Sequence, residues 1–546
     1  MPMKRIAAIA AFLFLLSGST IPQQAKPVLT KQATPSLPSY RWEFFDLNNI
    51  HCTLNNTGPF ADYQRTNSSG FFWPKGSPKS AIYTAGIWLA GIHRPTGQVR
   101  TAVQDYQSEY LPGTINGVFH SAANDTLKLA NPNSERYRVY KVNAGDTMAR
   151  DFREWPGDLG APYEDRNGNG VWDAGIDRPH ITGGQTLWCV YNDGRAAPHL
   201  TVAKTEPMGV EVQATYFGFN TVSFLRDVMF LRWKVINKSD AHYDDAFFGI
   251  WMDPDLGDAN DDCVGIDTLR RMMYVYNAND SDKGASGYGK APPALGVSFM
   301  RTPQQTGPVS GSSVLPLYAF NPMIYPFCFD CDPPPFDPYT LLKGLSLWRK
   351  PYADPSTGSV TRYPLAGDPV TGTGWVQLDS SFKGRDVRCV MSTGPMTLAP
   401  GDTQMVEAAI IITRGSDHLN SITRLRQSAD LVQEFFNDRY TTYDTPPPPP
   451  EPPPVPQFVE LTQNYPNPFN PVTRIVYTVP DLGAPYPVRL EVFDVLGKKA
   501  ADLVNGPVAS GTYQADWDAG AHPGGVYFYR LSVGGTTVVK KMLLLK

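Results

Sequence analysis

A run of prolines near the C-terminal end constrains the fold of this chain more than any other feature. Residues 445–457 read TPPPPPEPPPVPQ. Proline fixes the backbone dihedral φ and lacks the N–H donor, so this run forms neither a helix nor the inside of a sheet. We therefore expect an extended spacer over residues 444–457, which separates a large body from a C-terminal domain at 458–546.

The first 25 residues have the three-part pattern of a secretory signal peptide. Lys4 and Arg5 give the charged start, an apolar run covers residues 6–16, and small residues follow, up to Ala25. This run is shorter than the about 20 apolar residues of a membrane-spanning helix, and no later segment has the length and apolarity of one. The pattern predicts export by the Sec machinery with loss of residues 1–25, and no transmembrane helix.

The composition indicates many short strands joined by turns. The chain contains 47 Gly and 51 Pro, which favour turns, and its net charge is -4 without a basic stripe, which argues against nucleic-acid binding. Apolar and polar residues alternate in several body segments, and this period of two predicts antiparallel strands with one buried face. The clearest examples are residues 210–216, 231–235 and 246–250, with another strand expected at 405–412.

The expected fold class is mainly β. We expect a β-sandwich body made of two packed β modules, with an N-terminal β-rich region at 26–200 and a β-sandwich region at 201–443. Residues 416–439 have apolar side chains at helical spacing, with Ser416 as the N-cap. This segment is interpreted as a helix that closes the body.

The C-terminal domain contains the most specific motifs. They are N-Y-P-N-P-F-N-P at 464–471, F-D-V-L-G-K at 493–498, G-G-V-Y-F-Y-R-L at 524–531 and a basic, apolar last strand at 538–546. These motifs, in this order, resemble the type A C-terminal sorting domain of type IX secretion substrates, and also the Ig-like domain of flagellar hook-cap proteins. The alternating short strands and turns independently indicate a small Ig-like β-sandwich.

The resemblance implies a route out of a Gram-negative cell. Residues 458–546 would be recognised by the type IX translocon and by its sortase, and the cargo would be attached to surface lipopolysaccharide or released. Segments of the body resemble uncharacterised surface proteins of the same secretion class; these segments are 81–91, 185–193, 208–213 and 253–262. That class implies no catalytic residues.

An Asp/Asn-rich loop is a candidate calcium site. Oxygen-bearing side chains recur at every second residue around glycines, as in short extracellular calcium loops. The candidate ligands are Asp165, Asn167, Asn169, the Val171 carbonyl, Asp173 and Asp177. The alternative is a surface turn without metal, because the same residues favour turns. We expect a structural role for any bound calcium.

A second acidic cluster is a weaker candidate. Its carboxylates repel one another unless a cation or water screens them. Its members are Asp253, Asp255, Asp258, Asp261 and Asp262. The pair Cys328 and Cys331 has the spacing of a redox pair or of half a zinc site. The other four Cys are scattered and Pro333–Pro335 follow one residue later, so a local disulfide is the preferred interpretation.

The sequence contains no motif of a known catalytic centre. No HExxH, G-x-S-x-G or Walker loop is present, and the eight His are dispersed. We therefore expect a non-catalytic adhesive, structural or ligand-binding body with no catalytic residues and no cofactor beyond calcium. The alternative is an exported hydrolase that acts on polysaccharide or protein, for which a pair of carboxylates in a cleft would be needed.

Overall fold

The computed structural model describes most of the chain. The described residues are 41–63, 68–120, 125–200, 202–220, 223–284, 286–305, 313–324, 337–377, 386–440, 459–480 and 485–546. The signal peptide, the Cys328–Cys331 pair and the proline spacer lie outside these ranges and stay predictions. The chain divides into two compact units, Met1–Asn437 and Asp438–Lys546.

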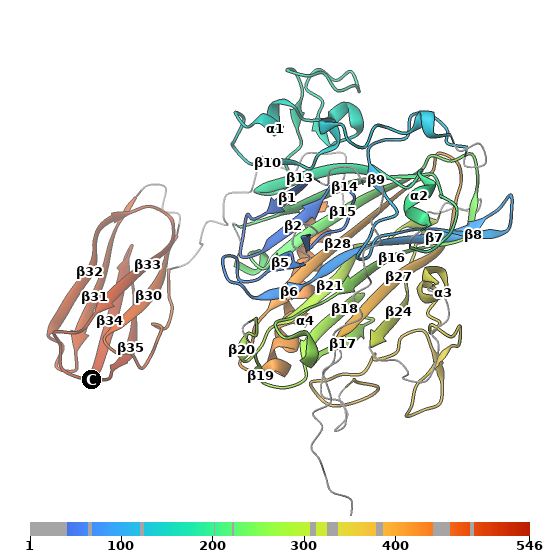
Figure 1. The fold of residues 1–546 in the computed structure, drawn as a ribbon. Helices are drawn as coiled ribbons and strands as arrows, with labels where there is room; N and C mark the ends of the chain where they lie inside the picture. Colours follow the sequence, from blue (N-terminus) through green and yellow to red (C-terminus); the bar gives the residue numbers. More distant parts are fainter. Residues whose placement is uncertain are drawn as a thin grey trace, which may run out of the picture. The chain divides into compact units, whose positions relative to one another are not determined.

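The body is built from two large antiparallel sheets (Figure 1). The larger sheet has the order β10 (Tyr140–Asn143), β13 (Gln185–Asn192), β14 (Val210–Gly218), β15 (Val228–Asn237), β28 (Thr403–Thr413), β21 (Ala294–Arg301), β18 (Met272–Asn277) and β17 (Asp262–Asp267), with β9 (Leu111–Pro112) beside β13. The smaller sheet has the order β24 (Leu317–Ile324), β27 (Val387–Leu398), β16 (Tyr243–Asp253), β7 (Thr84–His93) and β8 (Gln98–Val103). The mainly β fold expected from the sequence is confirmed.

Strands from both sequence regions of the body share these sheets. β13, from the 26–200 region, pairs along its whole length with β14, from the 201–443 region. In the smaller sheet, β7 pairs with β16 along most of its length, with an irregularity between Asp244 and Phe247. A further sheet, of β1 (Trp42–Phe45), β2 (His51–Asn55), β5 (Phe71–Phe72) and β6 (Ser80–Ile82), adds aromatic side chains to the same core.

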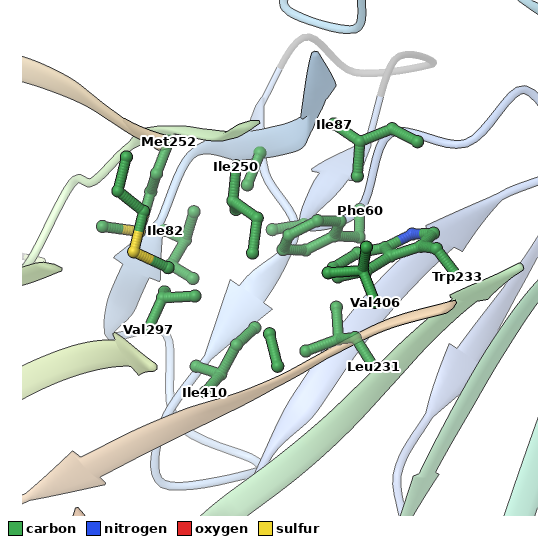
Figure 2. Close-up of a cluster of buried hydrophobic side chains, with 14 of the residues drawn as sticks. Phe60, Ile82, Ile87, Leu231, Trp233, Ile250, Met252, Val297, Val406 and Ile410 are labelled. Carbon is green, nitrogen blue, oxygen red and sulfur yellow. The ribbon is translucent and has the colours of Figure 1, made fainter. Parts of the chain in front are cut away.

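The main core lies between the facing sides of the two large sheets. Figure 2 shows Leu231 and Trp233 of β15 and Val406 of β28 facing Ile250 of β16, with Phe60 beside them. All five side chains are fully buried. The period of two in the sequence places alternate side chains on this side.

The other side of the larger sheet is also buried, which corrects the expectation of one buried face. All nine residues of β14 are buried. Its polar residues lie under the connection that runs between β9 and β13: Glu211 accepts a hydrogen bond from the Ile115 N–H at 2.8 Å, and the Gln213 amide donates to the Leu159 carbonyl at 3.3 Å. The polar side chains of β14 therefore face hydrogen-bond partners in the protein instead of water.

The closing helix is α4 (His418–Tyr440). Its apolar stripe is buried at Ile422, Leu425, Ala429, Val432 and Phe436. Phe435 contacts Phe219, next to β14, edge-on and Phe230 of β15 at a tilt. The N-cap differs from the expectation of Ser416. Asp417 accepts a hydrogen bond from the Asn420 N–H at 2.7 Å, three residues on, which is the capping geometry.

Short helices complete the body. These are α1 (Arg150–Arg153), α2 (Ala196–His199) and α3 (Pro338–Leu342). In the described residues, no helix has the length and apolarity needed to cross a membrane.

The described residues of the C-terminal unit form two antiparallel sheets around one apolar core. One contains β29 (Glu460–Leu461), β30 (Val472–Val479) and β33 (Gly511–Asp518). The other has the order β32 (Lys499–Val508), β31 (Tyr486–Asp494), β34 (Gly525–Val533) and β35 (Thr536–Leu544). The Ig-like relationship of this unit stays a prediction.

Candidate functional site

The N-Y-P-N-P-F motif of the C-terminal unit holds the last strand in place. Asn464 is buried and hydrogen-bonded within the protein. Its backbone N–H donates to the Tyr529 hydroxyl at 2.8 Å, and its side-chain amide donates to the Thr473 hydroxyl at 2.9 Å. Asn467 accepts from the Leu543 N–H at 2.9 Å, and the Phe469 N–H donates to the Leu543 carbonyl at 3.0 Å. The motif thus fixes β35, the strand that ends this unit.

In the body, the Asp/Asn loop lies between β11 (Tyr163–Glu164) and β12 (Arg178–Pro179). Asp165 accepts hydrogen bonds from the N–H groups of Gly168 and Gly170, each at 2.7 Å. These bonds, the Gly170 bond first, hold the pKa of the Asp165 carboxyl below its usual value. Asp165 is therefore an ionised carboxylate, the kind of ligand that calcium prefers.

The remaining candidate ligands converge on the same loop. The side-chain amides of Asn167 and Asn169 both donate to Asp173 Oδ2, at 2.8 and 2.6 Å. Asp177 is buried and accepts from the Asp173 N–H at 2.7 Å, while Val171 is exposed. These contacts tie the loop together, but the two asparagines present their NH₂ groups to Asp173, and among the described residues Asp165, Asp173 and Asp177 do not form a group whose carboxylate oxygens all lie within 4.8 Å of one another. Whether the loop binds calcium stays a prediction.

The second acidic cluster separates into two groups. Asp253, at the end of β16, and Asp255 lie with Asp386, so that one carboxylate oxygen of each is within 4.8 Å of the others. Burial raises the pKa of Asp253 to about 8, although Arg388 opposes this effect with its Nε 3.4 Å from Asp253 Oδ1. Arg388 also contacts Asp386 at 2.7 Å, and Tyr106 donates to Asp253 at 2.7 Å. The arginine therefore supplies positive charge to this group.

Asp258, Asp261 and Asp262 belong to the other group, beside Asp282. Asp282 accepts from the N–H groups of Asp258 and Tyr288, at 3.1 and 2.6 Å. Burial raises the pKa of Asp261 to about 7 and that of Asp262 far above its usual value. Asp262 accepts from the Leu256 N–H at 3.0 Å. Asp262 and Asp282 thus bind backbone N–H groups of the loops near the start of β17, which is a structural role.

A third group of titratable residues is fully buried. Glu109, Asp193 and His199 have side chains that are 0% exposed, and His199 lies between the two carboxyls at 3.5 and 3.6 Å. Glu109 accepts from the N–H groups of Val103 and Ala203, at 2.9 and 3.0 Å. A group closed off from solvent cannot meet a polymer substrate, so its hydrogen bonds serve the fold.

An open groove lies beside β10, where Figure 1 shows α1 and the neighbouring connection. Its volume is about 400 Å³. Arginines, carboxylates and aromatic rings line it: Glu135, Arg136, Arg138, Tyr140, Arg150, Arg153, Glu154, Trp155, Pro156, Asp158, Trp172 and Ala174. The sequence interpretation missed this groove. The density of arginine and tryptophan over 136–172 is the available signal, but only the fold brings these residues to one surface.

Comparison with known proteins assigns the C-terminal unit. Residues 463–545 match the family model of the secretion system C-terminal sorting domain. The chain thus carries a sorting domain of type IX secretion, as its motifs predict, and this domain implies interaction with the type IX machinery and export to the cell surface or beyond. No curated protein matches the chain.

Similarity to solved structures is weak. A polysaccharide lyase shares 7% identity at a TM-score of 0.19, over 61% of this chain and 34% of the lyase. The dimeric latent PorU from Porphyromonas gingivalis shares 12% identity at a TM-score of 0.15, over 66% of this chain and 31% of PorU. The chain spans about a third of each protein, and scores this low support no conclusion about the body.

Proposed function

We propose that this protein is a type IX secretion substrate whose body is a non-catalytic adhesive, structural or ligand-binding module on the cell surface or outside the cell. The match of residues 463–545 to the sorting domain supports the export part of the proposal. In this scheme the Sec machinery exports the chain and removes residues 1–25. A sortase then cleaves residues 458–546, and the body is attached to lipopolysaccharide or released.

The chemistry of the body supports a role without catalysis. The buried carboxylates of Glu109, Asp262 and Asp282 accept hydrogen bonds from backbone N–H groups, and Asp253 is bonded to Tyr106. A general acid or base needs access to substrate, which these buried groups do not offer. The carboxylates of the groove beside β10, Glu135, Glu154 and Asp158, are each paired with an arginine. Calcium in the Asp165–Asp177 loop would stabilise the loop and take no part in a reaction.

Deletion of residues 458–546 tests the export route. In a host with a type IX system, we expect the truncated chain to stay in the periplasm, because the translocon recognises the missing domain. As a matched gain-of-function control, a periplasmic reporter fused to residues 458–546 should reach the surface. Surface display of the truncated chain would refute the assignment of the sorting role.

Incubation of the mature chain with polysaccharides and denatured proteins tests the absence of catalysis. We expect no cleavage products by mass spectrometry. Products that vanish when a single Asp or Glu is changed would establish the alternative, an exported hydrolase.

A further inference from the structure

The groove beside β10 has an aromatic wall that the Asp/Asn loop supplies. Trp172 belongs to this loop, and its indole covers Gly157, where a Cβ atom would lie only 2.4 Å from the ring. Tyr163 supports the indole from the side, with ring centroids 5.4 Å apart. Glycine at position 157 is thus required for Trp172 to lie in its observed place. The half-buried indole forms a fixed, partly open ring surface.

The floor of the groove is rigid. Trp155 is 2% exposed and donates from its indole N–H to the Pro162 carbonyl at 2.8 Å. The Arg138 guanidinium lies 4.0 Å from the centroid of the buried Tyr140 ring, a cation–π contact. Because these side chains are held by packing and hydrogen bonds, a ligand meets a surface that is already formed, which lowers the entropy cost of binding.

Ion pairs hold most of the charged side chains of the groove. Arg138 pairs with Glu154 at 2.9 Å, Arg150 pairs with Glu135 at 3.0 Å, and Arg136 pairs with Asp158. These arginines and carboxylates point both donors and acceptors at the groove, which is the hydrogen-bonding pattern that sugar hydroxyls can match.

Arg153 differs from the other arginines of the groove. It is exposed, it lines the groove, and within the described part of the chain it makes no ion pair or side-chain hydrogen bond. Four arginines and three carboxylates line the groove, and Asp151, just outside the lining, also pairs with Arg138 at 2.8 Å, so the other three arginines have carboxylate partners and the Arg153 guanidinium is left for a ligand. A guanidinium binds a carboxylate through two parallel hydrogen bonds, which is stronger and more specific than a contact with a neutral hydroxyl.

We propose that this groove binds an acidic oligosaccharide, with a sugar ring on the Trp172 indole and a sugar carboxylate on Arg153. This deepens the proposed function and rests on it, because it names the ligand class of a binding body. The groove is open to solvent, so a ligand chain bound in it can continue beyond it. The Asp165–Asp177 loop is then a positioning element, since its hydrogen bonds determine where Trp172 lies.

Binding of the full mature chain to matched glycans tests the proposal. Calorimetric titration uses oligomers of galacturonic acid and the same oligomers with every carboxyl methyl-esterified, with alginate and dextran oligomers as further probes. We expect the acidic oligomers to bind more tightly than the esters, with an affinity that falls as salt rises. Equal binding of acid and ester, or no binding of any acidic oligomer, would overturn the proposal.

Two groove variants locate the site. R153Q removes the positive charge but keeps a shorter polar side chain, and it should weaken binding of the acid on the order of tenfold while leaving the ester unchanged. W172A should weaken binding of both, because both use the ring surface. R424Q changes an exposed arginine on α4 and serves as the matched control, with no expected change. Unchanged melting temperatures show that the variants are folded.

The outcomes separate this inference from the proposed function. Acid binding that survives both R153Q and W172A would overturn the groove assignment and leave a non-catalytic binding body in place. Cleavage of the acidic oligomers would overturn the non-catalytic body, and loss of that cleavage in R153Q would still assign the groove to the acidic glycan.

Discussion

The buried group at Asp193 makes a prediction about stability and pH. Asp193 is 0% exposed and accepts hydrogen bonds from the N–H groups of Met208 and Val210, at 2.6 and 2.7 Å. Burial opposes the charged form and these bonds favour it. Burial is the larger effect and raises the pKa of Asp193 to about 7, from a usual value of 3.8. The folded protein therefore keeps a proton on Asp193 that the unfolded chain loses.

The sign of the pH dependence follows from this difference. A carboxyl with a raised pKa in the folded state contributes stability below about pH 4, and this contribution is lost as the pH rises through about 7. One pH unit corresponds to about 1.4 kcal/mol, so the interval of roughly three units amounts to about 4 kcal/mol. Asparagine at this position does not titrate, so the stability of D193N does not fall with rising pH for this reason.

Asparagine has a cost of its own. Its amide NH₂ group cannot accept a hydrogen bond, so either the Met208 or the Val210 N–H is left buried without a partner, which costs about 1–3 kcal/mol. D193N should therefore unfold at a lower temperature than the parent protein at pH 5. By pH 8 the parent has lost its advantage, so the difference should vanish or reverse.

Neighbouring groups set the limits of this prediction. Burial raises the pKa of Glu109 to about 8 and lowers that of His199 to about 4, and Arg100 favours the charged form of Asp193. The charge on Asp193 also raises the pKa of Glu109, so the difference between D193N and the parent reports these two carboxyls together. Calorimetric melting at pH 5, 6.5 and 8 measures the difference, and D438N, an exposed change on α4, is the control. A difference that stays constant or grows with pH would show that Asp193 is ionised throughout and refute the reasoning.

Three further predictions concern the helix cap, the core and the loop. D417A should lower the melting temperature of the body while S416A leaves it unchanged, because Asp417 caps α4; equal effects would restore Ser416 as the cap. W233A empties a fully buried site and should cost about 3–5 kcal/mol in denaturant unfolding; a cost under about 1 kcal/mol would place Trp233 outside a close-packed core. Calcium should bind the parent in calorimetric titration, and the double change D165A and D173A should remove one site; an unchanged stoichiometry would exclude the loop.

Local patterns in the sequence predict the elements of this fold well. The alternation at residues 210–216 and 231–235 identifies β14 and β15, and the helical spacing after residue 416 identifies α4 within two residues. The cap was assigned to the wrong neighbour because Ser416 and Asp417 are both good N-cap residues. Only the hydrogen bond to Asn420 distinguishes them, and that depends on where the helix begins.

Burial on both sides of β14 could not be predicted from the same pattern. Glu211 and Gln213 are polar, and polar residues at alternate positions indicate a side that faces water. Here the chain between β9 and β13 covers that side and supplies an N–H and a carbonyl as partners. A strand sequence specifies which residues share a side, but not what covers it, because the cover is a distant segment.

The same limit explains why the candidate sites were only partly found. The Asp165–Asp177 loop is local, so its candidate ligands can be named from their spacing in the sequence alone. The acidic cluster is not local: Asp253 and Asp255 meet Asp386, which directly precedes β27, the strand beside β16, while Asp258, Asp261 and Asp262 belong to a separate group. Trp172 combines a local and a non-local signal. It belongs to a loop that the sequence identifies, but its packing on Gly157, and hence its place in the wall of the groove, depends on the fold. Substitutions in the Asp165–Asp177 loop that displace Trp172 should therefore weaken glycan binding in the groove, although the loop's carboxylates do not contact the glycan.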